Sequence, residues 1–273
     1  MAIHRNRLVA QLSRQDRQQM LAIGQSDQLV SGSVLCEPGD TLGAVYFPTN
    51  CTVSVSALAG GAARLGLTLV GREGMLGTSL LLGSRSSSLR TVVQTSGEAL
   101  RIDATQFSDA LERSHTLQRS LLAHVPFVIA KISTTPACAR FHTMERRLAY
   151  WLLMFRDRCE APSFDMNQES LASLVGARRV SVTHAALELR CRGLIEYHRG
   201  HVVVLDDVGL ETAACECYAA DRTLMKDLKG LDRRPTTSPA TIRCRAKVMT
   251  PSMPCTCSAE PATSKDRYTR SVA

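Results

Sequence analysis

The chain has 273 residues, of which 44% are hydrophobic and 21% are charged. This composition excludes a chain that is disordered throughout, and the length allows about two domains, each with its own core. The ten cysteines stand singly or as C-x-C pairs rather than as the framework of a secreted disulfide protein, so we expect a reduced, cytoplasmic protein. No run approaches about eighteen uncharged apolar residues and residues 1–14 have no apolar signal core, which predicts neither export nor a membrane span.

The net charge of +8 is concentrated near the C-terminus. Residues 229–273 hold nine basic and three acidic side chains, and the rest of the chain holds only +2. The composition of this basic tail predicts disorder and non-specific attraction to phosphate. A nucleic-acid site in the folded part must therefore be argued from the local arrangement of residues.

The N-terminal part predicts one or two helices followed by a small antiparallel β-roll. Ser13 and Asp16 form a capping box at the start of a helix that ends near Ile23. Short β-prone runs then alternate with glycine, proline and serine turns, at residues 33–36, 45–47, 51–55, 65–70, 90–94 and 99–102. Asp103 begins a further helix that continues through Arg113.

A longer apolar periodicity covers Leu117, Leu121, Val125, Val128 and Ile132. Pro126 lies inside it and should bend the helix rather than end it. Such a seam serves either packing on its own domain or contact between two copies of the chain. Another apolar helix follows from Met144 to Phe155, and we place the domain boundary near residues 138–142.

Residues 167–190 predict two short helices joined by a tight turn. Asn167 caps the first helix, and Gly176-Ala177 ends it. The second helix turns Val182, Ala185, Ala186 and Leu189 inward, and leaves Arg178, Arg179, Ser181, Thr183, His184 and Arg190 outside or flanking. A helix of this kind fits the major groove of DNA, where arginine binds guanine in a bidentate way.

A β-hairpin that turns at Arg199-Gly200 follows within residues 193–205. It would form a wing beside the two helices. A basic helix alone is typical of a solvated face, but the order of capped helix, glycine turn, basic helix start and basic-tipped hairpin is far more specific.

At these residues the chain resembles the Crp/Fnr family of bacterial transcription regulators. The resemblance is strongest in Q168-E-S-L-A-S-L-V-G-A-R-R-V-S-V-T183, with L187-E-L189 and G193-L-I195, and weaker over about residues 15–225. It implies an α+β fold with a cyclic-nucleotide-binding-like antiparallel β-roll, a long dimerisation helix and a winged helix-turn-helix. The corresponding boundaries are 1–114 for the effector-type roll with its N-terminal helix, 115–140 for the dimerisation helix, 141–228 for the DNA-binding domain and 229–273 for the basic tail.

The resemblance implies a homodimeric, sequence-specific DNA-binding regulator that reads a palindromic site. Its partners would be double-stranded DNA and a second copy of the chain, with RNA polymerase as a further candidate and no membrane. The candidate DNA-binding residues are Asn167, Gln168, Arg178, Arg179, Val180, Ser181, Thr183, His184 and Arg199. Val180 and His184 replace residues that are often glutamate and arginine in the family, so the target sequence should differ from the best-known sites.

The candidate effector-binding residues are Gly77, Thr78, Arg85 and Ser86. In cyclic-nucleotide-binding relatives, a glycine and a glutamate hold the ribose, and an arginine with small residues holds the phosphate. Thr78 stands where that carboxylate should be, and Glu73 lies nearby at the wrong offset. We therefore expect an unknown effector or none, with a cyclic-nucleotide-responsive regulator as one alternative and a small-molecule-binding module without DNA readout as another.

The sequence predicts no catalytic residues, no cofactor and no metal ligands. The cysteines are not clustered near the N-terminus as an iron–sulfur sensor requires. A barrel enzyme of the cupin type needs histidines, and none lies between His4 and His115. Cys215 and Cys217 fall in an expected helix over residues 208–228, where they would point about 200° apart, and Cys255-Thr256-Cys257 lies in a low-complexity segment.

Overall fold

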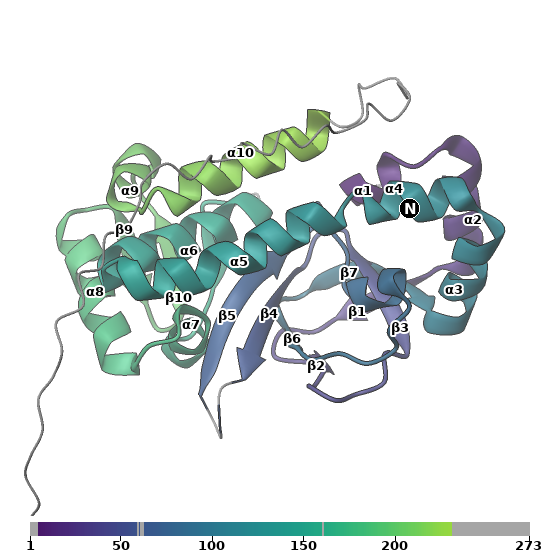
Figure 1. The fold of residues 1–273 in the computed structure, drawn as a ribbon. Helices are drawn as coiled ribbons and strands as arrows, with labels where there is room; N and C mark the ends of the chain where they lie inside the picture. Colours follow the sequence, from purple (N-terminus) through teal and green to yellow (C-terminus); the bar gives the residue numbers. More distant parts are fainter. Residues whose placement is uncertain (1–4, 59, 61–62, 160, 231–273) are drawn as a thin grey trace, which may run out of the picture. The chain divides into compact units, whose positions relative to one another are not determined.

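The computed structural model describes residues 5–58, 60, 63–159 and 161–230 (Figure 1). Two antiparallel sheets form the predicted roll. One has the order β1-β7-β3 and the other has the order β2-β6-β4-β5. Their strands are β1 (Gln25–Leu29), β2 (Val34–Cys36), β3 (Ala44–Pro48), β4 (Thr52–Leu58), β5 (Arg64–Val70), β6 (Arg90–Thr95) and β7 (Gly97–Asp103).

The helices around the roll begin at the predicted caps. α1 (Arg7–Ala10) and α2 (Arg14–Ile23) are the N-terminal pair, and the Ser13 side chain accepts a hydrogen bond from the Asp16 backbone N–H at 3.1 Å. Asp103 caps α3 (Ala104–Arg113) in the same way. The core between these helices and the β1-β7-β3 sheet contains fully buried Phe47, Phe107 and Leu117.

The predicted long helix consists of two pieces in the structure. α4 (His115–Leu122) ends before a turn at residues 123–124, and α5 (Val125–Phe141) begins there. Pro126 lies in the first turn of α5, where its missing N–H needs no partner. The expectation of one helix bent at Pro126 is therefore wrong, and the proline inside a helix is Pro136.

Among the described residues, the stretch His115–Phe141 contains an eighteen-residue segment with a mean hydropathy of 1.3, long and apolar enough to cross a membrane. This departs from the prediction of no membrane span, because a mean over eighteen residues tolerates the polar His124 and Lys131. Only 28% of that segment is buried. One stretch of this kind is weak evidence for a membrane span, since helices of water-soluble proteins meet the same criteria.

The C-terminal part packs around α6 (Met144–Cys159), which is buried on nearly every side. The predicted helix pair is α7 (Gln168–Val175) and α8 (Arg179–Cys191). A three-stranded sheet of order β8-β10-β9 contains the predicted hairpin, with β8 (Ser163–Asp165), β9 (Ile195–His198) and β10 (His201–Val204). The α+β fold, with an antiparallel roll and a winged helix-turn-helix, is thus confirmed.

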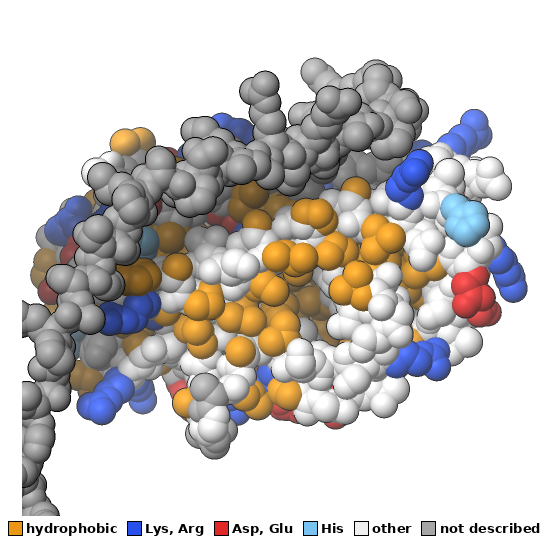
Figure 2. Space-filling model, viewed as in Figure 1, with side chains coloured by type: hydrophobic (Ala, Val, Ile, Leu, Met, Phe, Trp, Pro, Cys, Tyr) orange, Lys and Arg blue, Asp and Glu red, His pale blue; other side chains and the backbone are white. Residues whose placement is uncertain are grey.

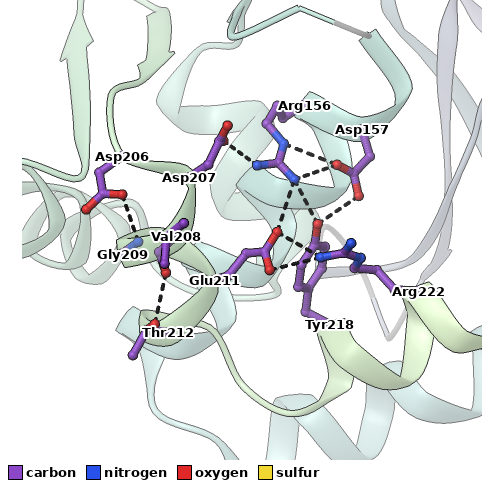
Figure 3. Close-up of polar contacts among 10 residues, drawn as sticks. All are labelled: Arg156, Asp157, Asp206, Asp207, Val208, Gly209, Glu211, Thr212, Tyr218 and Arg222. Carbon is purple, nitrogen blue, oxygen red and sulfur yellow. Dashed lines mark hydrogen bonds and ion pairs between the residues drawn. The ribbon is translucent and has the colours of Figure 1, made fainter.

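The chain after the wing also differs from expectation. The predicted helix over residues 208–228 is interrupted, because α9 (Asp207–Ala213) ends before α10 (Cys217–Gly230) begins. An ion-pair network holds both helices on α6: Arg156 pairs with Asp157 and Asp207 and donates to the Tyr218 hydroxyl at 2.8 Å (Figure 3). Most of the predicted basic tail lies outside the described residues.

Candidate nucleic-acid interface

Local sequence fixes the turn between α7 and α8. The Asn167 side chain accepts a hydrogen bond from the Ser170 N–H at 2.8 Å, which starts α7. Gly176 ends it with φ +67°, a conformation that strains any residue with a Cβ. Val182, Ala185, Ala186 and Leu189 are all buried, as the periodicity predicted. The second helix therefore presents a single, determined face outward.

That outward face carries the predicted DNA contacts at the start of α8. Arg178, Arg179, Ser181, Thr183 and His184 are exposed, and the Val180 side chain is 66% exposed. Arg178 is the N-cap residue, and its side chain makes no capping hydrogen bond. The first-turn N–H groups of α8 thus have no side-chain cap, which suits a phosphate oxygen at the positive end of the helix dipole.

Gln168 joins the two helices through its side-chain carbonyl. Arg179 Nε and Thr183 Oγ1 each donate to Gln168 Oε1 at 3.2 Å. Gln168 itself is half-buried. The structure therefore brings Gln168, Arg179 and Thr183 into one hydrogen-bonded group, which restricts the directions in which the guanidinium can point.

The wing places Arg199 apart from this group. Arg199 has φ +48° and Gly200 has φ +85°, the geometry of a tight hairpin turn. Arg199 and Asn167 line a groove of about 380 Å³ together with Ser31 and Gln94 of the roll. These two residues therefore lie beside the roll, whereas the α8 residues do not line that groove.

The predicted effector residues separate into two pairs. Gly77 and Thr78 line an apolar cavity of about 110 Å³ between the roll and α5. Arg85 and Ser86 are exposed, and Arg85 Nη2 donates to Thr105 Oγ1 at 3.0 Å. The structure thus does not bring the candidate phosphate-binding residues to the cavity that Gly77 and Thr78 line.

Three buried polar residues outside the predicted sites, Glu73, His124 and Lys131, line the same cavity. Glu73 Oε1 lies 2.8 Å from Arg158 Nε, and Lys131 pairs with Asp221. His124 Nδ1 has no hydrogen-bond partner among the described residues, and burial lowers its pKa to about 4. The sequence signal that could have revealed this cluster is the presence of ionisable His124 and Lys131 within the apolar stretch of residues 117–132.

The expectation that Cys215 points away from Cys217 is wrong. It assumed one continuous helix, but the break between α9 and α10 leaves both cysteines buried, at 2% and 8% exposure. Both sulfurs lie near Cys138 and His142 at the end of α5.

Comparison with known proteins identifies the domain that carries α7 and α8. Residues 146–213 match the family model described as the Crp-like helix-turn-helix domain. No curated protein matches the chain.

Solved structures agree with the fold over most of the chain. A Crp/Fnr-family transcriptional regulator of Thermus thermophilus is 21% identical with a TM-score of 0.57, and the match covers 70% of this chain and 98% of that one. FixK2 from Bradyrhizobium japonicum is 14% identical with a TM-score of 0.61, and the match covers 71% and 98%.

The c-di-GMP-responsive global regulator CLP of Xanthomonas campestris is 18% identical with a TM-score of 0.59, and the match covers 70% of this chain and 99% of that one. At such identities the likeness concerns the fold. The resemblance drawn from the sequence is confirmed: the chain has the fold of the Crp/Fnr transcription regulators, and its residues 146–213 form a Crp-like helix-turn-helix domain.

Proposed function

We propose that this protein is a sequence-specific DNA-binding transcription regulator that acts as a homodimer on a palindromic site, with an effector still to be identified. The observation that carries the proposal is the exposed N-terminal end of α8 in a Crp-like domain. Its arginines, hydroxyls and uncapped N–H groups match base edges and phosphates.

The role of each residue follows from its chemistry and position. Arg179 is the best candidate for a bidentate contact to guanine O6 and N7, because its guanidinium is exposed and oriented by Gln168. Val180 offers a methyl contact to thymine. Arg178, Ser181 and the first-turn N–H groups suit phosphate oxygens, and Arg199 would follow the backbone from the wing.

The surface of α5 supports the homodimer. Ile129 is 54% exposed, and its neighbours Phe127, Val128 and Ile132 are only half-buried. Figure 2 shows hydrophobic side chains gathered over α5 and the adjoining part of the molecule. An exposed apolar helix face is normally covered by a partner. Two copies paired along α5 would cover this face and present two recognition helices to successive major grooves.

The cavity beside α5 argues against a cyclic nucleotide as the effector. Its volume of about 110 Å³ lies below the ~300 Å³ at which small-molecule pockets usually begin. The Glu73 carboxylate is paired with Arg158, and Thr78 offers no carboxylate for a ribose hydroxyl. Any signal that acts on the roll would work by shifting the dimer between arrangements that match or miss the DNA spacing.

In vitro selection from randomised duplexes, followed by gel shift on the enriched sequence, tests the function. We expect an inverted repeat whose half-site centres lie about one helical turn apart. Enrichment of no sequence would contradict DNA readout and leave a module that binds only small molecules. Enrichment of a single half-site without a repeat would contradict the homodimer.

A further inference from the structure

Four potential metal ligands converge where the end of α5 meets the connection between α9 and α10. Cys138 Sγ lies 3.5 Å from Cys215 Sγ, and His142 Nδ1 lies 3.5 Å from Cys138 Sγ and 3.6 Å from Cys217 Sγ. All four ligand atoms lie within 4.8 Å of one another. Cys138, Cys215 and Cys217 are buried, and the His142 side chain is 14% exposed.

The backbone accounts for this convergence. Cys138 lies in the last turn of α5 and His142 is its C-cap residue, so these two positions, four residues apart, lie on the same side of the helix end. Cys215 and Cys217 flank the break between two helices, which allows both thiols of a C-x-C to point the same way. The Arg156 network described above fixes both helices on α6 and so holds this connection in place (Figure 3).

The spacing fits one tetrahedral ion. For Zn–S bonds of about 2.3 Å and Zn–N bonds of about 2.0–2.1 Å, tetrahedral angles require S···S distances of about 3.8 Å and S···N distances of about 3.6 Å. The three measured distances, 3.5, 3.5 and 3.6 Å, lie within about 0.3 Å of those values. The other three pairs of ligand atoms lie within 4.8 Å, so closing all four ligands around an ion needs shifts of about 1 Å at most.

A carboxylate orients the histidine as it does in known zinc sites. His142 Nε2 lies 2.9 Å from Glu216 Oε1, and Glu216 Oε2 accepts from Arg146 Nη2 at 2.9 Å. With its proton on Nε2 and directed at the carboxylate, the imidazole turns the lone pair of Nδ1 toward the three sulfurs. Histidine ligands commonly donate their second nitrogen to such a partner, and this arrangement is an observation independent of the cysteine cluster.

The surroundings also suit thiolates. The buried guanidinium of Arg147 interacts electrostatically with Cys138 and Cys215. Three thiolates and a divalent ion carry one net negative charge, which Arg147 offsets.

We infer that Cys138, His142, Cys215 and Cys217 form a structural Zn²⁺ site that fastens the end of α5 to the α9–α10 connection. On binding, the three thiols release their protons to solvent and the ion gains four protein ligands. A site with four protein ligands leaves no position for a substrate, so its role is structural rather than catalytic. Zinc is preferred over Mg²⁺ or Ca²⁺ because those ions select oxygen ligands.

Elemental analysis of the full-length protein, purified without a histidine tag, tests the site. We expect about one zinc per chain. After removal of the metal by a chelator under reducing conditions, titration with Co²⁺ should give the visible bands of a tetrahedral ion and a thiolate-to-metal charge-transfer band. Addition of Zn²⁺ should abolish those bands and raise the thermal midpoint of unfolding.

Variants assign the ligands. Cys138→Ser and Cys215→Ser should each lose the stoichiometric zinc, whereas His142→Cys should retain zinc and shift the Co²⁺ spectrum toward four thiolates, which shows that the fold persists. Glu216→Gln should weaken the metal affinity by about 10- to 100-fold. The exposed Cys191→Ser and the combined variant Cys244→Ser/Cys255→Ser/Cys257→Ser, outside the described residues, are controls that should retain one zinc per chain.

Three results would overturn the inference. One is retention of zinc by the double variant Cys138→Ser/Cys215→Ser. Another is loss of zinc in the tail control. The third is a Cys138–Cys215 disulfide in freshly purified protein together with no Co²⁺ uptake after its reduction.

Discussion

Arg179 is the first residue of α8 and the main candidate for base recognition. It is exposed, and its Nε donates a hydrogen bond to Gln168 Oε1. Within the described part of the chain, both terminal nitrogens are left for a base. We predict that Arg179→Ala weakens binding to the selected site by about 1–3 kcal/mol and leaves binding to random duplex nearly unchanged.

Gel shifts on both duplexes at a fixed salt concentration measure this effect. Arg190→Ala is the matched control, because Arg190 is also exposed on α8 but lies in its last turn. Equal losses on specific and random DNA would show that Arg179 contacts phosphate only.

His124 is the buried residue with the clearest dependence on pH. Burial lowers its pKa from 6.5 to about 4, although Glu73 opposes the shift. The unfolded chain therefore binds a proton at a higher pH than the folded chain does. Stability from this residue is complete above pH 6.5 and is lost as the pH falls toward 4, by about 3 kcal/mol in all.

We predict that His124→Phe reduces the loss of stability between pH 7 and pH 4.5, because the variant has no imidazole to protonate. Urea unfolding at both pH values measures the difference. His115→Gln removes an exposed histidine and should leave the loss unchanged. An identical acid sensitivity in wild type and His124→Phe would contradict the burial of an uncharged imidazole.

At the scale of elements, the turn between α7 and α8 depends on Gly176 in two ways. Its φ of +67° strains any other residue, and a Cβ there would lie 2.5 Å from Leu65 Cδ1 on β5. Gly193 has a similar φ of +70°, but a Cβ there would meet nothing within 4 Å. A substitution at Gly193 therefore tests backbone strain alone, and one at Gly176 tests strain together with contact against the roll.

We predict that Gly193→Ala lowers the free energy of unfolding by about 1 kcal/mol and that Gly176→Ala lowers it by about 2 kcal/mol. Equilibrium unfolding in urea measures both values. Equal losses for the two variants would mean that the helix-turn-helix does not pack against β5 in solution.

The elements that sequence predicts best are those whose signals are local. Asn167, Gly176 and the Arg199-Gly200 turn each specify their own backbone geometry, so the helix pair and the hairpin were predicted almost to the residue. β1 was missed because Gln25–Leu29 is polar and β-poor, and it becomes a strand only by pairing with β7. A strand that depends on pairing with a distant segment shows no recognisable pattern in its own sequence.

The same distinction explains the error at the cysteines. Residues 213–216 contain no glycine or proline, so nothing local signals the break between α9 and α10. The break arises where α9 and α10 are both held on α6 by Arg156 and Tyr218. Cys215 and Cys217, expected on two different helix faces, therefore lie together with Cys138 and His142.

At the scale of the whole molecule, α5 links the functional regions. Thr135 Oγ1 donates to Leu67 O on β5 at 2.7 Å, and Lys131 pairs with Asp221 on α10. One face of α5 is thus bound to both the roll and the C-terminal helices, and the opposite face carries exposed Ile129. In a dimer paired along the outer face of α5, a conformational change in the roll can therefore be transmitted through α5 to the DNA-binding domain.

We predict that Ile129→Glu converts the protein from dimer to monomer, because an unpaired carboxylate buried in an apolar contact costs about 3 kcal/mol or more, roughly 100-fold in the dimer constant. Sedimentation equilibrium measures that constant, and the affinity for the full palindrome should fall with it while the affinity for a single half-site stays the same. Val208→Glu is the control, since Val208 is also an exposed apolar residue, at 77% exposure, but belongs to α9 rather than α5. A dimer of unchanged affinity in Ile129→Glu would place the subunit contact on another surface, and loss of half-site binding would show that the variant had damaged the DNA-binding domain instead.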